Sequence, residues 1–207
     1  MAKVMAISNQ KGGVGKTTTA INLAAGLSAA GKTVLLVDFD SQGNASQGLS
    51  AFFTEDQPTV YSVLMEGVPV QEAVVRSEAN GFDILPANLA LAGADLEMDK
   101  QGAGKEQLLS RALEPLRDQY DYILIDCPPS LGLLNTNALT AADTVLIPVQ
   151  CEYYALEGLS QLIHTIDLVQ QRLNPNLIID GVVFTMYDVR TNLSNQVVEN
   201  VKENLDA

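Results

Sequence analysis

Two lysines that lie five residues apart, Lys11 and Lys16, stand in the glycine-rich stretch SNQKGGVGKTTTAINLAA, residues 8–25. Glycines let a loop fold so that its backbone N–H groups point at phosphate oxygens, and a lysine beside them neutralises phosphate charge. A threonine hydroxyl directly after the lysine binds Mg²⁺ in such loops. The stretch therefore predicts a phosphate-binding loop, formed by Gly12, Gly13, Val14, Gly15, Lys16, Thr17 and Thr18.

Each side chain of this loop has an expected task. Lys16 would reach the β- and γ-phosphates of a nucleotide, Thr17 would bind Mg²⁺, and Thr18 is placed for the α-phosphate. The alternative is a glycine-rich turn without a ligand. An apolar run before the loop and a helical pattern after it favour phosphate binding, because such loops join a strand to a helix.

Three aspartates follow apolar runs that are typical of strands: Asp38 and Asp40 in VDFDSQG, and Asp126 in YILIDCPP. Ligands of open α/β sheets bind beyond the carboxyl ends of the strands. We expect Asp126 to hold Mg²⁺ directly or through water, and Asp38 to lie nearer the water shell of the metal. The alternatives are a structural role for the strand-end acids, and a helix cap or turn role for Asp40.

Apolar runs alternate with helical patterns along the chain, which predicts an α/β fold with a mostly parallel, twisted sheet and helices on both faces. The predicted strands are Val4–Ser8, Thr33–Asp38, Phe82–Leu85, Tyr122–Asp126, Thr144–Val149 and Ile178–Phe184. The predicted helices are Lys16–Ala30, Lys105–Gln119, Leu131–Ala141, Leu156–Leu173 and Leu193–Leu205, with short helices at Val60–Leu64 and Val70–Val75.

Composition limits the classes of protein to which the chain can belong. Its 207 residues predict one domain, 1–207, and the sequence has no apolar run of membrane-spanning length and no signal-peptide pattern. Two cysteines without a CxxC motif indicate neither a disulfide framework nor a zinc site, and the simplest location is the cytoplasm. The net charge of −13 argues against nucleic acid as a partner.

The motif KGGVGKTT resembles the deviant Walker A motif of the ParA/MinD family of ATPases, in which a P-loop carries an additional lysine. The strict pattern G-x-x-x-x-G-K-T fails at Gln10. The resemblance extends over the whole chain through VDFDSQGNAS, YILIDCPPSLG, VLIPVQCEYYALEGL and TMYDVRTNLS, and it is strongest to the chromosomal ParA, or Soj, branch. Members of the family commonly continue for another strand and one or two helices beyond the position of Ala207.

The resemblance implies ATP and Mg²⁺ as cofactors and a homodimer that forms when ATP is bound. Lys11 would reach across the dimer interface to the phosphates held by the partner, and Lys16 and Asp40 would complete the catalytic set. Asp40 matches the family's aspartate that orients the attacking water. Ser41 stands where the family usually has proline. A ParB-like, DNA-bound partner would stimulate slow hydrolysis of ATP.

The resemblance also implies binding of the ATP-bound dimer to DNA without sequence preference, and therefore a cytoplasmic, nucleoid-associated protein that segregates chromosomes or plasmids. Arg190 matches a family position on the DNA surface; a surface ion pair with Asp188 is the alternative. Thr185, Met186 and Asp188 are candidates for contact with the purine. No membrane partner is expected.

Other functions share these motifs. A MinD-like membrane switch would need a basic amphipathic C-terminal helix, whereas the last helical pattern is acidic. A cargo-positioning ATPase would differ only in its partner. A metabolic P-loop enzyme would need a second substrate site, for which the sequence gives no signal.

Overall fold

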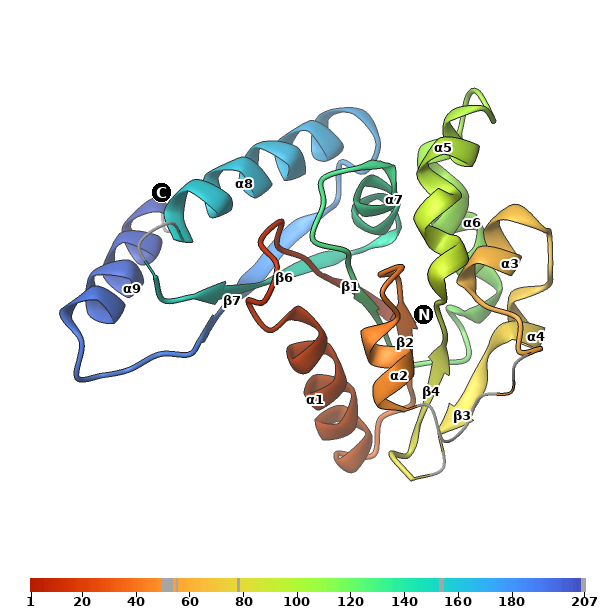
Figure 1. The fold of residues 1–207 in the computed structure, drawn as a ribbon, viewed down its shortest axis with the longest axis horizontal. Helices are drawn as coiled ribbons and strands as arrows, with labels where there is room; N and C mark the ends of the chain where they lie inside the picture. Colours follow the sequence, from red (N-terminus) through yellow and green to blue (C-terminus); the bar gives the residue numbers. More distant parts are fainter. Residues whose placement is uncertain (50–53, 55, 78, 153–154, 206–207) are drawn as a thin grey trace.

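The computed structural model describes residues 1–49, 54, 56–77, 79–152 and 155–205. Its centre is a seven-stranded sheet in the order β3-β4-β2-β5-β1-β6-β7 (Figure 1). All neighbouring strands are parallel except β3, which runs antiparallel to β4 at one edge. The strands are β1 Lys3–Ile7, β2 Val34–Asp38, β3 Val75–Ser77, β4 Phe82–Leu85, β5 Tyr122–Asp126, β6 Thr144–Gln150 and β7 Ile178–Thr185.

Helices cover both faces of this sheet, as the alternating pattern predicts. One face packs against α1 (Lys16–Ala29) and α2 (Asn44–Gly48). The opposite face carries the larger core, beneath the remaining helices. These are α3 Val60–Met65, α4 Val70–Ala73, α5 Ala94–Asp99, α6 Leu108–Leu113, α7 Leu133–Ala141, α8 Ala155–Arg172 and α9 Asn192–Leu205.

The central strands are apolar on both sides because both sides are covered. Leu35 and Val37 of β2 enter the larger core, whereas Val34 and Leu36 enter the core beneath α1. All four side chains are buried. The polar residue at the end of this strand, Asp38, pairs in register with Asp126 at the end of β5. The sheet thus brings the two carboxylates that the sequence singled out to one edge.

The main errors of the sequence prediction lie between β4 and β6. The predicted helix Lys105–Gln119 is wrong as a single helix. It consists of a 3₁₀ turn at Lys105–Gln107, α6, and a second 3₁₀ turn at Glu114–Leu116, because Pro115 lacks the N–H that an α-helical turn requires. The predicted start at Leu131 is also two residues early, because α7 begins at Leu133.

Short elements account for the other differences. The predicted helix Val70–Val75 ends at Ala73, because Val75 pairs with Ile84 in β3. The sequence prediction missed β3, α2 and α5, which have three, five and six residues and are too short for a periodic pattern to develop.

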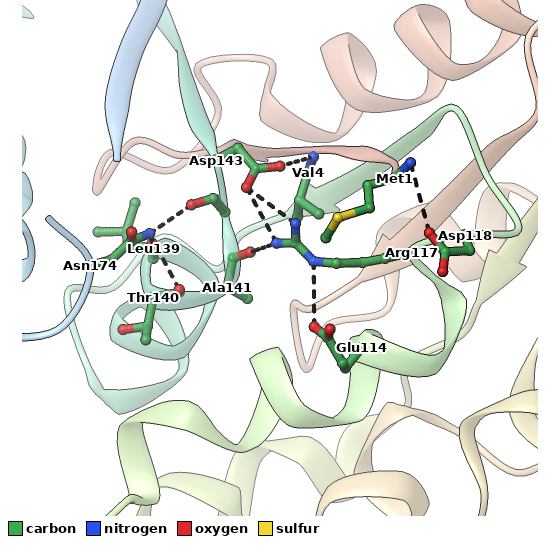
Figure 2. A network of polar contacts seen from close by, with 11 residues as sticks. Met1, Val4, Glu114, Arg117, Asp118, Leu139, Thr140, Ala141, Asp143 and Asn174 are labelled. Atoms are coloured by element: carbon green, nitrogen blue, oxygen red, sulfur yellow. Dashed lines mark hydrogen bonds and ion pairs between the residues drawn. The ribbon is translucent and has the colours of Figure 1, made fainter. Parts of the chain in front are cut away.

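The carboxyl end of α7 is held by side chains from two other segments (Figure 2). Asn174 Nδ2 donates to the carbonyl oxygens of Leu139, Thr140 and Ala142 at 3.1, 3.3 and 2.7 Å. The Arg117 guanidinium donates to the Ala141 carbonyl oxygen and contacts Asp143, whose other carboxylate oxygen accepts the backbone N–H of Val4 in β1. These contacts supply donors to helix-end carbonyls that lack a helical partner, and they join α7 to β1.

We predict that Asn174→Ala lowers the free energy of unfolding by about 1–3 kcal/mol, because several partly buried carbonyl groups lose their donor. The measurement is chemical denaturation followed by circular dichroism. Asn22→Ala is the matched control, because the exposed Asn22 side chain bonds only one carbonyl of its own helix. Equal stability of the two variants would contradict the role assigned to Asn174.

Candidate active site

The glycine-rich loop lies between β1 and α1, as predicted, and its glycines adopt conformations that other residues avoid. Gly13 and Gly15 have φ angles of 75° and 90°. Gly15 is also the N-cap of α1, and no side chain caps the helix there. The backbone N–H groups at the start of α1 therefore remain available to an anion, and the helix dipole favours negative charge at this position.

Lys16 is buried at the base of this loop, with 7% of its surface exposed. Its Nζ donates to the backbone oxygen of Lys11 at 3.0 Å, so the lysine spans the loop. Burial lowers the pKa of Lys16, and the nearby negative charges of Asp126 and Asp40 oppose this effect. A buried ammonium group in this position is stabilised further by an anionic ligand such as phosphate.

Asp126 is fully buried, and neither of its carboxylate oxygens has a hydrogen-bond partner among the described residues. The pKa of Asp126 is raised to about 7 because burial and the neighbouring charge of Asp38 raise it more than the Thr17 hydroxyl and the charge of Lys16 lower it. A buried carboxylate that lacks donors takes up a proton or a cation. This donor set fits Mg²⁺, with Asp126 and the hydroxyl of Thr17 as the residues that would hold it.

Asp38 is also fully buried, but its oxygens are already engaged. They accept the backbone N–H and the hydroxyl of Ser46 at 2.8 and 2.6 Å, and the backbone N–H of Asp40 at 3.3 Å. Burial raises the pKa of Asp38, and the bonds from Ser46 oppose the rise. Asp38 thus fastens the segment 40–46 to the sheet, a role of Ser46 that the sequence analysis missed. Its predicted place in the water shell of a metal stays a prediction.

A cavity of about 450 Å³ brings most of the predicted residues together. Asp40 lies in its wall, 7% exposed, and its Oδ1 accepts the backbone N–H of Gln42. Gln42, Asn44 and Pro129 also line the cavity and were missed, because no motif marks them. The complete lining is Gly12, Gly13, Gly15, Lys16, Thr17, Thr18, Asp40, Gln42, Asn44, Pro129 and Met186.

Thr185 and Met186, two of the residues proposed for purine contact, differ in position: Thr185 bonds to the phosphate loop, whereas Met186 lines the cavity. The hydroxyl of Thr185 donates to the backbone oxygen of Val14 at 2.8 Å, so Thr185 fastens the phosphate loop to β7. Met186 follows with a φ angle of 51°, lines the cavity, and is 65% exposed. Its predicted contact with the base agrees with this placement but stays a prediction.

Lys11 does not line the cavity that contains Lys16. Its ammonium group forms an ion pair with Glu152, which follows β6 and was not singled out in the sequence. Lys11 lines a second cavity of about 440 Å³, together with Pro129, Ser130, Leu131 and residues of α8. The two lysines of the loop therefore face different spaces, and the loop after β5 borders both.

Arg190 lies apart from both cavities, with its side chain 85% exposed. Its Nε and one terminal nitrogen contact the carboxylate of Asp188 at 2.9 and 2.7 Å. This is the surface ion pair that the sequence left open as the alternative to DNA contact. A DNA-binding role for Arg190 stays a prediction.

The features of this site, a glycine-rich loop at a helix N-terminus with a buried lysine and a strand-end carboxylate, define a P-loop nucleotide-binding protein. The described residues contain no group of three or more His, Cys, Asp or Glu side chains suited to a metal. A Mg²⁺ ion here would accordingly depend on phosphate and water for most of its ligands. No described helix combines the length and apolar character needed to cross a bilayer.

Comparison with known proteins identifies the family. The AAA_31 family model, described as an AAA domain, matches residues 2–179. The chain is 54% identical over 203 residues to the sporulation initiation inhibitor protein Soj of Bacillus subtilis, covering 98% of this chain and 80% of Soj. It is 55% identical over 202 residues to the chromosome partitioning protein ParA of Myxococcus xanthus, covering 98% and 71%. The chain therefore belongs to the ParA/Soj family of P-loop proteins.

A solved structure agrees with this fold. The structure of a Mycobacterium smegmatis protein named cobyrinic acid a,c-diamide synthase, with a bound ATP analogue and magnesium, superposes with a TM-score of 0.91. The sequences are 44% identical, and the alignment covers 98% of this chain and 82% of that one.

We predict that Asp126→Asn stabilises the nucleotide-free protein by about 4 kcal/mol at pH 8, because the pKa of Asp126 is raised from 3.8 to about 7 and one pKa unit corresponds to about 1.4 kcal/mol. The raised pKa means that Asp126 contributes stability below its unfolded pKa near 4, and that this contribution is lost as pH rises through about 7. The wild-type protein should thus lose stability between pH 4 and 8 relative to the variant.

Thermal unfolding of both proteins across this pH range, without nucleotide, measures the difference. Asp121→Asn is the control, because Asp121 is an aspartate whose pKa is lowered by hydrogen bonds from Thr33, so its replacement should not stabilise the protein at pH 8. If the stability of wild type and of Asp126→Asn changed with pH in parallel, the raised pKa of Asp126 would be contradicted.

Proposed function

We propose that this chain is an ATPase that binds ATP with Mg²⁺ in the cavity of the phosphate loop and hydrolyses it slowly. The observation that carries this proposal is the buried pair at the base of the loop, where desolvated Lys16 faces Asp126, whose oxygens lack donors among the described residues. The two groups attract each other without forming an ion pair, and a nucleotide phosphate and its metal would give each of them a directly bonded counter-charge.

The residues of the cavity have separate tasks in this proposal. The N–H groups of the loop and Lys16 hold the phosphates, while Asp126 and Thr17 hold the metal, which supplies charge neutralisation in phosphoryl transfer. Asp40 orients the attacking water. The bond from Gln42 fixes the Asp40 carboxylate at the cavity wall, so that little reorganisation is needed.

We further propose that the ATP-bound form is a homodimer, as expected of a partitioning ATPase. The position of Lys11 supports the proposed dimer. Its side chain lines the second cavity and not the phosphate cavity of its own chain, and it is 36% exposed. A cation in that orientation can neutralise phosphates held by a second copy. In the monomer, the ion pair with Glu152 neutralises the charge of Lys11, and binding of the second copy would replace this ion pair.

We propose that this dimer binds DNA without sequence preference, acts with a ParB-like DNA-bound partner, and works in the cytoplasm on the nucleoid. The support is the identity to Soj and ParA. With a net charge of −13, and with Arg190 paired to Asp188, binding should be confined to a local patch and depend strongly on salt.

Lys11→Ala should abolish ATP-dependent dimerisation while leaving nucleotide binding within about threefold of wild type, because Lys11 does not line the cavity of its own chain. Light scattering after gel filtration, with ATP or ADP and Mg²⁺, measures the mass. Lys32→Ala, the loss of an exposed lysine elsewhere, is the control. An ATP-dependent dimer of Lys11→Ala would contradict the proposed contact between copies.

The DNA step is tested with Asp40→Ala, which should bind ATP without hydrolysing it. We expect this variant to sediment with non-specific duplex DNA only with ATP and Mg²⁺, and to be released as salt rises from about 50 to 200 mM, because phosphate contacts release counterions. Lys16→Ala, which removes the phosphate contact, should not sediment. An Asp40→Ala dimer that ignores DNA at low salt would favour the alternatives, a MinD-like membrane switch or a cargo-positioning ATPase.

A further inference from the structure

The loop between β5 and α7, residues 127–132, separates the two cavities of the site. Pro129 lines the phosphate cavity on one side. Pro129, Ser130 and Leu131 line the second cavity on the other, beside Lys11. The loop thus forms the boundary between the phosphate cavity and the space beside Lys11.

Asp95 in α5 fixes the end of this loop from outside both cavities. Its Oδ1 accepts the backbone N–H of Leu134 in the first turn of α7 at 2.9 Å, and the negative charge suits the N-terminus of that helix. Helices α5 and α7 lie side by side in the layer that covers this face of the sheet (Figure 1).

The absence of a side chain at Gly132 allows the Asp95 carboxylate to lie close to the start of α7. A Cβ atom at this position would lie 2.7 Å from Asp95 Oδ2, closer than such atoms approach one another. The backbone of Gly132 has a φ angle of −74°, which any residue adopts, so the requirement for glycine here is space and not conformation. The carboxylate therefore packs directly on the last residue of the loop.

The rest of α7 is held independently of Asp95. The hydroxyl of Ser8, the residue after β1, donates to Oδ1 of buried Asn135 at 2.9 Å. The carboxyl end is held by Asn174 and Arg117 (Figure 2). Loss of the Asp95 contact would therefore loosen the first turn of α7 and its junction with Gly132, while the rest of the helix keeps its place.

We propose that Asp95 is a positioning residue for ATP hydrolysis, which holds Pro129–Leu131 at the boundary between the phosphate cavity and the space occupied by Lys11. This inference rests on the proposed function. Asp95 acts through Leu134 and Gly132, and it lines neither cavity. It therefore affects the rate of hydrolysis and not the binding of ATP, which depends on the phosphate loop.

Steady-state hydrolysis of ATP by purified full-length variants tests this inference. Asp95→Ala should lower kcat about tenfold with KM for ATP within twofold of wild type. Asp95→Asn, which keeps an oxygen acceptor for Leu134 N–H, should recover most of the rate. Asp99→Ala is the control, because Asp99 lies on the same helix and its exposed carboxylate pairs, among the described residues, with Lys105 alone. Hydrogen exchange at the Leu134 amide should accelerate in Asp95→Ala and not in the control.

A double-mutant cycle separates positioning from loss of fold. Gly132→Ala should crowd Asp95 and lower kcat, whereas Asp95→Ala with Gly132→Ala should be no slower than Asp95→Ala alone, because the two residues act through one contact. Wild-type kcat in Asp95→Ala, or strictly additive losses in the cycle, would overturn the inference. Wild-type protein that binds but never hydrolyses ATP would instead overturn the proposed function.

Discussion

The site depends on two buried groups of opposite charge, Lys16 and Asp126, which attract each other without forming an ion pair. Asp126 has no donor for its carboxylate among the described residues, and Lys16 is desolvated and bonded only to a backbone oxygen. The low dielectric of the surroundings makes each charge costly by itself. The rest of the fold keeps these groups in place: parallel pairing aligns β1, β2 and β5, and packing on both faces prevents the strand ends from relaxing into water.

The parallel sheet explains why residues from distant segments share this site. β1 carries the loop, β2 delivers Asp38 and Asp40, and β5 delivers Asp126. Asp38 and Asp126 are register partners, so the like charges of the site are imposed by strand pairing. The structure resolves this conflict by giving them different neighbours. Asp38 receives donors from Ser46 and Asp40, whereas the oxygens of Asp126 have no hydrogen-bond partner among the described residues.

The sequence was sufficient to predict the α/β class, six of the seven strands, and a glycine-rich loop between β1 and α1, because each has a strong local pattern. It could not predict that Lys11 and Lys16 face different cavities, because the direction of Lys11 is set by Glu152, which lies 141 residues further along the chain. It could not predict the contact of Asp95 either. That aspartate lies on a six-residue helix without periodicity, and its partner is a backbone N–H, which no motif records.

The two ends of the phosphate cavity differ in how strictly they define a ligand. The phosphate-loop end combines glycines with positive φ angles, the buried ammonium group of Lys16 and the nearby buried carboxylate of Asp126. An uncharged ligand would leave both charged groups without a direct counter-charge. At the outer wall, Met186 presents a flexible thioether with most of its surface exposed. Such a side chain adapts to rings of different shape and offers no strong donor or acceptor. Met186 therefore adds apolar contact area to this cavity, whose polar groups among the described residues come from residues 12–18, Asp40, Gln42 and Asn44.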